Sequence, residues 1–168
     1  TEDGPGGDTW ADDHEAYKTG GGGTWVTGSY DSELNLIYWG VGNPGPDWDR
    51  HYRPGDNLFS NSTIALDADT GEIKFHFQYT PNDPFDFDGV NEHVLVDTQY
   101  KDKPHQMMLH ADRNGYLYAI NRVDGSFIYA TPYVQRLNWT SGIDPVSGRP
   151  LDFDPEAKVQ NYAGVASS

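Results

Sequence analysis

Two stretches of similar pattern, STIALDADTGEIKFHFQ at residues 62–78 and GYLYAINRVDGSFIYAT at residues 115–131, decide the fold of this chain. Each starts with alternating apolar and polar residues, turns at an Asp-Thr-Gly or Asp-Gly sequence, and continues as a second alternating run. This period of two is typical of β-strands, and the turn residues are typical of hairpins. Ala65 and Ala119 occupy equivalent places about 54 residues apart, which suits one four-stranded blade of a β-propeller.

The rest of the chain alternates in the same way and is broken often by Gly, Asp and Pro, which predicts short antiparallel strands and few helices. Strands are expected near residues 25–30, 36–40, 62–67, 73–78, 93–98, 106–112, 116–121 and 126–131. The acidic, glycine-rich residues 1–19 are expected to form a loop. The predicted fold is therefore all-β, with a few four-stranded antiparallel blades across residues 1–168. So few blades cannot close a ring, and we expect an internal part of a longer propeller.

Composition excludes several function classes. The formal net charge of the 168 residues is -15 and no Lys/Arg cluster is present, which argues against nucleic acid or an anionic membrane as partner. No apolar run reaches the length of a membrane span. Without cysteine, the chain offers neither a disulfide nor a thiolate metal site, and its six histidines lack the spacing of a zinc site.

The stretch PNDPFDFDGVNE at residues 81–92 places Asp86 and Asp88 two positions apart among aromatic rings. In an extended segment the two carboxylates would point to the same side. Two such anions repel and raise each other's pKa unless a cation lies between them. The pair therefore indicates either an acidic surface loop or a metal or acid/base site.

Three further residues are candidates for binding, each with a purely structural alternative. The glycines of GGGGTWVTGSYD (20–31) permit close approach of a ligand to Trp25, whose indole offers a flat platform; the alternative is a loop leading to a core Trp. Asn43, in Gly-Asn-Pro, could present an oxygen to a hard cation or could simply form a turn. Arg113 precedes a tight Asn-Gly turn, where its guanidinium could clamp a carboxylate or quinone oxygen or could be solvated.

Six segments, taken in order, resemble the quinoprotein alcohol dehydrogenases that depend on pyrroloquinoline quinone (PQQ). They are GGGGTWVTGSYDSELNLIYWGVGNPGPDW, RPGDN, ALDADTGEIKFHFQYTPND, DFDGVNE, LHADRNGYLYAINR and LNWTSGID, and they run from about residue 20 to residue 144. The resemblance implies a periplasmic eight-bladed β-propeller that carries PQQ and a metal ion on its axis. The implied reaction is the oxidation of an alcohol to an aldehyde, with hydride passing to PQQ.

Motif matches imply a role for each candidate. Trp25 is similar to the indole beneath the PQQ ring, and Thr24 beside it to a PQQ contact. Asn43 is similar to the metal-binding Asn. Asp86 looks like the active-site carboxylate, which binds the metal ion and takes the hydroxyl proton, and Arg113 looks like the basic residue at the quinone oxygens.

Asp88 bears on which metal is bound. In lanthanide-type members a second Asp stands two positions after the active-site Asp, whereas calcium-type members carry a non-acidic residue there. The sequence FDFDG therefore favours a lanthanide ion, with Asp88 as an additional ligand and calcium as the alternative. One departure is Phe75, where the blade-docking repeat usually has Trp; we expect Phe75 still to pack apolar surface.

The implied partners are a small alcohol, a cytochrome c that accepts electrons, and the remaining blades. The family's other metal ligand, a Glu, and its adjacent-cysteine disulfide belong to stretches outside this chain. Two alternatives stay open: a non-catalytic propeller that serves as a binding scaffold, and a PQQ-dependent sugar or polyol dehydrogenase of the same fold.

Overall fold

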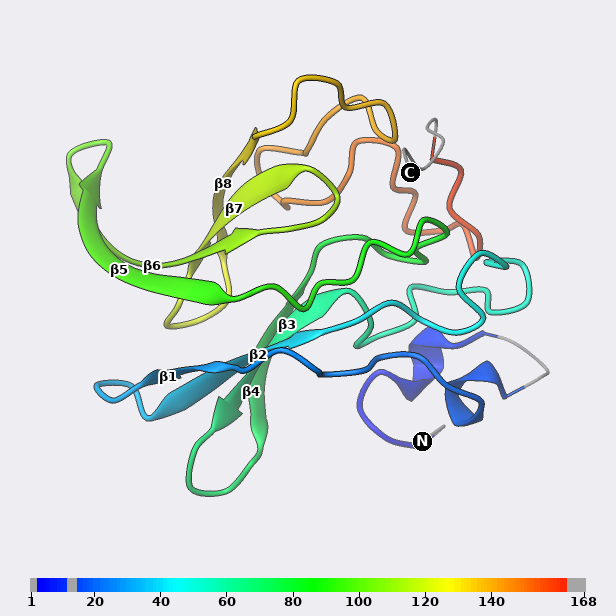
Figure 1. The fold of residues 1–168 in the computed structure, drawn as a ribbon, viewed down its shortest axis with the longest axis horizontal. Helices are drawn as coiled ribbons and strands as arrows, with labels where there is room; N and C mark the ends of the chain where they lie inside the picture. The colour runs from blue at the N-terminus through cyan, green and yellow to red at the C-terminus, as the bar shows by residue number, and fades with distance from the viewer. Residues whose placement is uncertain (1–2, 12–14, 163–168) are drawn as a thin grey trace.

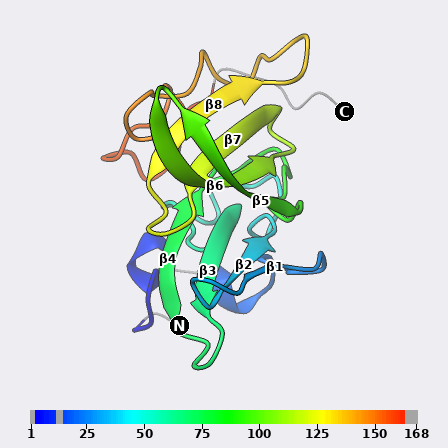
Figure 2. The same cartoon turned by 90° about the vertical axis from the view of Figure 1, so that its left-hand side faces the viewer.

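A computed structural model describes residues 3–11 and 15–162 of the chain. These residues form two four-stranded antiparallel sheets, each in simple sequential strand order. The second sheet lies above the first in Figure 2. No α-helix occurs in the described residues, and no helix among them could cross a membrane. The all-β prediction is confirmed.

The first sheet consists of β1 (Ser29–Asp31), β2 (Leu36–Val41), β3 (Ser62–Asp67) and β4 (Ile73–Gln78). The second consists of β5 (His93–Tyr100), β6 (Lys103–Ala111), β7 (Tyr116–Asn121) and β8 (Phe127–Pro132). The strands β3, β4 and β7 coincide with the predicted ranges. The β5–β6 hairpin is longer than predicted and curves away from the rest of its sheet (Figure 1). Each half of the sequence repeat thus forms the β3–β4 or the β7–β8 hairpin of one sheet.

Two predictions for the N-terminal part need correction. Residues 1–19 contain two short 3-10 helices, η1 (Gly7–Thr9) and η2 (Ala16–Lys18), while residues 1–2 and 12–14 lie outside the described residues. The strand expected over residues 25–30 begins only at Ser29. The glycines that precede Trp25 pair with residues 42–43: Gly42 N donates to Gly23 O at 2.8 Å, and Gly22 N donates to Asn43 O at 2.7 Å.

The two sheets pack through aromatic side chains. Phe77 of β4 stacks on Phe127 of β8, with ring centroids 6.1 Å apart. Phe75 packs against the same core, and Gly125 in the β7–β8 turn lies so close to it that a Cβ there would be 2.5 Å from Phe75 Cδ2. Phe75 therefore packs apolar surface between the blades, as expected for this position. Aromatic groups bury a large area and supply most of the packing energy at such a contact.

A buried arginine also connects the sheets. Arg122, at the end of β7, donates from Nε to Asp31 Oδ2 of β1 at 2.7 Å and from Nη1 to Asp97 Oδ1 of β5 at 2.7 Å. Its backbone oxygen accepts a hydrogen bond from the hydroxyl of Tyr38 at 2.7 Å. A buried guanidinium is tolerated only when its donors are paired, so this cluster ties β1 and β5, the first strands of the two sheets, to one cation.

Candidate functional site

Three segments that are distant in the sequence meet beyond the end of β2. Single antiparallel bridges join Gly21 to Pro44 and Val41 to Gly89. Asn61 N donates to Gly42 O at 2.9 Å, which fixes the same turn from the side of β3. The glycine-rich segment, the Gly-Asn-Pro turn and residues 81–92, hereafter the acidic loop, are thereby brought together.

Gly42 lies at the centre of this junction because no other residue fits there. A Cβ at Gly42 would lie 2.8 Å from Cζ3 of Trp25 and 2.9 Å from Oδ1 of Asp88, closer than real Cβ contacts. The Trp25 ring and the Asp88 carboxylate thus both contact the backbone of Gly42. The Trp25 side chain is nevertheless 62% exposed, which leaves most of a large flat ring free for a ligand. Thr24 beside it is also exposed.

Asp88 and Arg113 form an ion pair at this junction. Asp88 is buried, its Oδ2 accepts from Nη1 of Arg113, and its Oδ1 accepts from Asn43 N at 3.1 Å. Burial raises the pKa of Asp88, with further contributions from Asp47 and Asp112, while Asn43 and Arg113 oppose the rise. The side chain of Arg113 is half exposed, so its other donors can still reach a ligand.

Asn43 presents a free oxygen. Its Nδ2 donates to Asp47 Oδ1 at 2.9 Å, which orients the carboxamide. Within residues 3–11 and 15–162, no hydrogen bond reaches Oδ1 of Asn43, so this oxygen is available to a cation. Asp47 was not a candidate from sequence; only its place four residues after Asn43 could have suggested it.

Asp86 is the unpaired acid of the site. Its half-buried carboxylate makes no hydrogen bond or ion pair with any described residue. Burial raises the pKa of Asp86, and the charges of Asp88 and Asp47 raise it further, against an opposing effect of Arg113. Three carboxylates and one arginine therefore leave excess negative charge here, which a cation would neutralise.

The backbone of the acidic loop differs from the extended form expected from sequence. Asp86 and Asp88 have φ angles of 62° and 58°, both in the left-handed region. The argument that period-two spacing places the carboxylates on one face is therefore wrong, although their charges still interact. Pro84 and the hydrogen bonds of Asp83 to the amides of Phe85 and Phe87 favour a coiled loop over a strand.

The donors fit a hard metal ion but supply only part of its coordination shell. Carboxylate and carboxamide oxygens of Asp86, Asp88 and Asn43 are the ligand types that such ions prefer. The described residues contain no group of three or more His, Cys, Asp or Glu side chains placed to hold a metal ion. Trp25, Asn43, Asp88 and Arg113 are directly connected through contacts or hydrogen bonds, and Asp86 joins them electrostatically.

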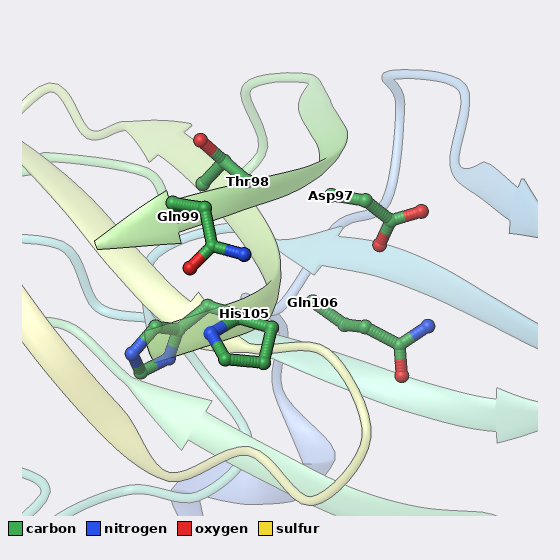
Figure 3. Close-up of a pocket in the computed structure, with 6 residues that line it drawn as sticks. Asp97, Thr98, Gln99, His105 and Gln106 are labelled. Carbon is green, nitrogen blue, oxygen red and sulfur yellow. The ribbon is translucent and has the colours of Figure 1, made fainter. Parts of the chain in front are cut away.

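A hollow lies away from this junction, on the β5–β6 hairpin. Figure 3 shows Asp97, Thr98, Gln99, His105 and Gln106 around it. None of the candidate residues from the sequence lines this hollow, and Asp97 is already paired with Arg122. The candidate site is therefore the junction around Gly42.

Residues 2–135 match the family described as glucose/ethanol/alcohol dehydrogenase, β-propeller domain. The chain is 49% identical over 153 residues to quinoprotein alcohol dehydrogenase PedH of Pseudomonas putida, a match that covers 90% of this chain and 25% of that protein. It is 40% identical over 164 residues to the lanthanide-dependent methanol dehydrogenase of Methylorubrum extorquens, which covers 95% of this chain and 27% of that protein.

Two solved structures match this chain at a similar sequence identity and over a similar share of its length. A europium-containing methanol dehydrogenase matches with a TM-score of 0.81 at 42% identity, over 88% of this chain and 25% of that one. Quinohemoprotein alcohol dehydrogenase from Comamonas testosteroni matches with a TM-score of 0.81 at 39% identity, over 87% of this chain and 22% of that one. The chain thus spans about a quarter of the length of the relatives it matches.

Proposed function

Because the chain belongs to the glucose/ethanol/alcohol dehydrogenase β-propeller family, we propose that it forms about a quarter of a PQQ-dependent alcohol dehydrogenase, an eight-bladed propeller. The observation that carries this proposal is the convergence of Trp25, Asn43, Asp88 and Arg113 at one junction, with the unpaired Asp86 beside them. A propeller used only as a scaffold has no reason to keep an exposed indole, a free carboxamide oxygen and an unpaired acid together.

Asp86 is the proposed general base. When bound, PQQ supplies the two-electron oxidant and the metal ion supplies Lewis acidity. The Asp86 carboxylate takes the proton of the substrate hydroxyl group, since no described residue occupies its oxygens.

Trp25 and Arg113 are the proposed contacts to PQQ. The exposed indole provides a flat apolar surface on which a planar tricyclic quinone stacks. Arg113 would stabilise negative charge on the quinone oxygens of bound PQQ, and its ion pair with Asp88 holds the guanidinium in place. Thr24, exposed next to Trp25, is assigned as an additional polar contact.

The proposed metal is a lanthanide ion bound by Asn43 Oδ1, Asp86 and Asp88. An additional carboxylate attracts an ion of charge +3 more strongly than one of charge +2, which is the reason to prefer a lanthanide over calcium. Support comes from relatives named as lanthanide-dependent and europium-containing. In this proposal Asp88 both binds the metal ion and pairs with Arg113. Residues outside the described part of the chain complete the coordination shell of the metal ion.

The proposed substrate is a small primary alcohol. One relative, 42% identical over 149 residues, is named methanol dehydrogenase [cytochrome c] subunit 1. We propose that this protein also passes its electrons to a cytochrome c, and that both proteins are located in the periplasm. The family description also names glucose, so sugars and polyols belong in the substrate panel.

The test uses the complete protein, stripped of metal and reloaded with PQQ and either La³⁺ or Ca²⁺. We expect alcohol oxidation to be high with La³⁺ and low with Ca²⁺, and we expect Asp88→Ala to remove the La³⁺-dependent activity selectively. Asp67→Ala is the matched control, because Asp67 ends β3 and its carboxylate accepts hydrogen bonds from Asp69 N and Thr70 N in the β3–β4 turn rather than at the junction. Full activity with Ca²⁺, or La³⁺ activity that survives Asp88→Ala, would contradict the lanthanide assignment; absence of PQQ binding under all conditions would favour a scaffold.

A further inference from the structure

We propose that Asp83 is the positioning residue of the acidic loop, and that its carboxylate sets the backbone on which Asp86 and Asp88 are presented to the metal ion. The inference rests on the proposed function, because it assigns the source of the geometry of that metal site. Asp83 itself lies in the interior and is not a ligand.

The carboxylate of Asp83 is fully buried and accepts three hydrogen bonds. Phe85 N donates to Oδ1 at 2.7 Å, and Phe87 N donates to Oδ2 at 2.8 Å. The Nδ2 of Asn61 donates to Oδ2 at 2.6 Å. The two amides belong to the residues immediately before and after Asp86, so the carboxylate holds the chain on both sides of the proposed base.

The loop needs this support. Asp86 and Asp88 both adopt left-handed φ angles, which Asp tolerates better than most residues but adopts less readily than glycine. No other acceptor within residues 3–11 and 15–162 takes the amide hydrogen of Phe85 or Phe87. Burial raises the pKa of Asp83 to about 6. All three of its partners are N–H donors, the set that an ionised carboxylate accepts.

A buried arginine extends the same framework to the Asn43 side of the site. The Nη2 of Arg53 donates both to the backbone oxygen of Asp83 and, at 2.8 Å, to that of Asp47. Its Nε donates to Pro46 O at 2.9 Å. Arg53 is completely buried, so the acidic loop and the turn that follows Asn43 are fixed to one guanidinium. Asp83 and Arg53 together set the relative position of the two groups of proposed ligands.

Asp83→Asn tests this role with almost no change in volume. The carboxylate receives two donors at Oδ2 and one at Oδ1, so a carboxamide turned either way faces at least one N–H with its own NH₂ group. An unsatisfied buried donor is costly, and we expect the loop to move rather than keep that contact. The matched control is Asp144→Asn, because Asp144 accepts from Val146 N and Ser147 N in a similar turn on the surface.

The main readout is the affinity of the complete protein for Tb³⁺, measured by luminescence titration without alcohol or electron acceptor. We expect Asp83→Asn to weaken Tb³⁺ binding by about tenfold or more, the effect of one unsatisfied buried donor, and Asp144→Asn to leave it unchanged. Excess La³⁺ should restore the kcat of the Asp83→Asn holoenzyme, because mass action compensates for a weakened site. Thermal unfolding and circular dichroism establish that the variants are folded.

The outcomes separate this inference from the proposed function. If wild-type protein binds Tb³⁺ and folded Asp83→Asn binds it equally well, Asp83 has no positioning role and the proposed function stands. If wild-type protein binds no Tb³⁺, both the lanthanide assignment and the role of Asp83 fall. If Asp83→Asn does not fold, the Asn61→Gly variant provides the test. Glycine can keep the left-handed φ of 46° at this position, and the substitution removes one hydrogen-bond donor to Asp83. Tb³⁺ binding must then weaken measurably, and unchanged binding overturns the inference.

Discussion

Gly42→Ala is a sharp perturbation of the site, since it adds one methyl group where two functional side chains meet. The new Cβ would lie 2.8 Å from Cζ3 of Trp25, 3.0 Å from its Cη2 and 2.9 Å from Oδ1 of Asp88. Contacts this short do not persist, so at least one of the two groups must move. Asp88 is buried and held by Asn43 N and by Arg113, whereas the Trp25 ring is 62% exposed. We therefore expect the indole to move.

The size of the effect follows from overpacking. Inserting a methyl group into a filled space costs about 1–3 kcal/mol. If PQQ stacks on the indole in its present position, restoring that position on binding incurs this cost, and PQQ affinity should fall by about 5- to 150-fold. The sheets themselves should remain intact, because Gly42 lies beyond the end of β2 and keeps its backbone hydrogen bonds to Gly23 and Asn61.

The assay is a titration of the metal-loaded complete protein with PQQ, followed by the quenching of tryptophan fluorescence, together with thermal unfolding. Gly71→Ala is the control for the addition of a methyl group at glycine, because a Cβ at Gly71 meets nothing within 4 Å. The control should change stability slightly through its φ of 74° and leave PQQ affinity unaltered. Wild-type PQQ affinity in a folded Gly42→Ala protein would refute the placement of PQQ on Trp25.

Three further predictions concern single side chains. Trp25→Ala should weaken PQQ binding by about 1 kcal/mol or more, through loss of the stacking surface, while the far-ultraviolet circular dichroism stays β-rich; full PQQ occupancy would contradict the assignment. Arg113→Ala should lower kcat by about 100-fold, and Arg113→Lys should retain part of the rate because a point charge remains, so wild-type turnover in the Ala variant eliminates this role. Burial, with a smaller effect of His110, lowers the pKa of His93 to about 3. Between pH 6.5 and 3 the unfolded chain therefore binds one more proton than the folded chain. The free energy of unfolding should fall as pH falls, by up to about 1.4 kcal/mol per pH unit. His93→Gln should reduce that slope in urea unfolding measured at pH 7 and pH 5, and an unchanged slope would show that His93 is not its source.

The fold could be predicted from sequence wherever local pattern and tertiary structure agree. The hairpins of residues 62–78 and 115–131 combine alternation with turn residues, and their strands were predicted to within one residue. The strand expected from Trp25 was wrong at its start, since β1 begins only at Ser29. The glycines just before Trp25 are hydrogen-bonded to residues 42–43, a long-range contact that no local pattern indicates.

The site was predictable as a set of residues but not as a geometry. Trp25, Asn43, Asp86, Asp88 and Arg113 were identified by motif, and the structure places them at or beside one junction; their chemical roles stay predictions. The pairing of Asp88 with Arg113 could not be read from sequence, because any of many carboxylates could have met that arginine. The coiled backbone of the acidic loop was also missed, since the hydrogen bonds that Phe85 N and Phe87 N donate to the buried carboxylate of Asp83 have no signal in the local pattern.

The cluster around Arg122 has a consequence for how the protein is made. Asp31 is buried against a cation that lies 91 residues further along the chain. At the usual rates of synthesis, about 5–20 residues per second, the ribosome needs about 5–20 s to deliver Arg122 after Asp31 has emerged. Throughout that interval the first blade can form its hairpins but cannot bury Asp31 against its partner. A nascent chain of this kind should therefore stay open to chaperones and proteases until its second blade has been synthesised.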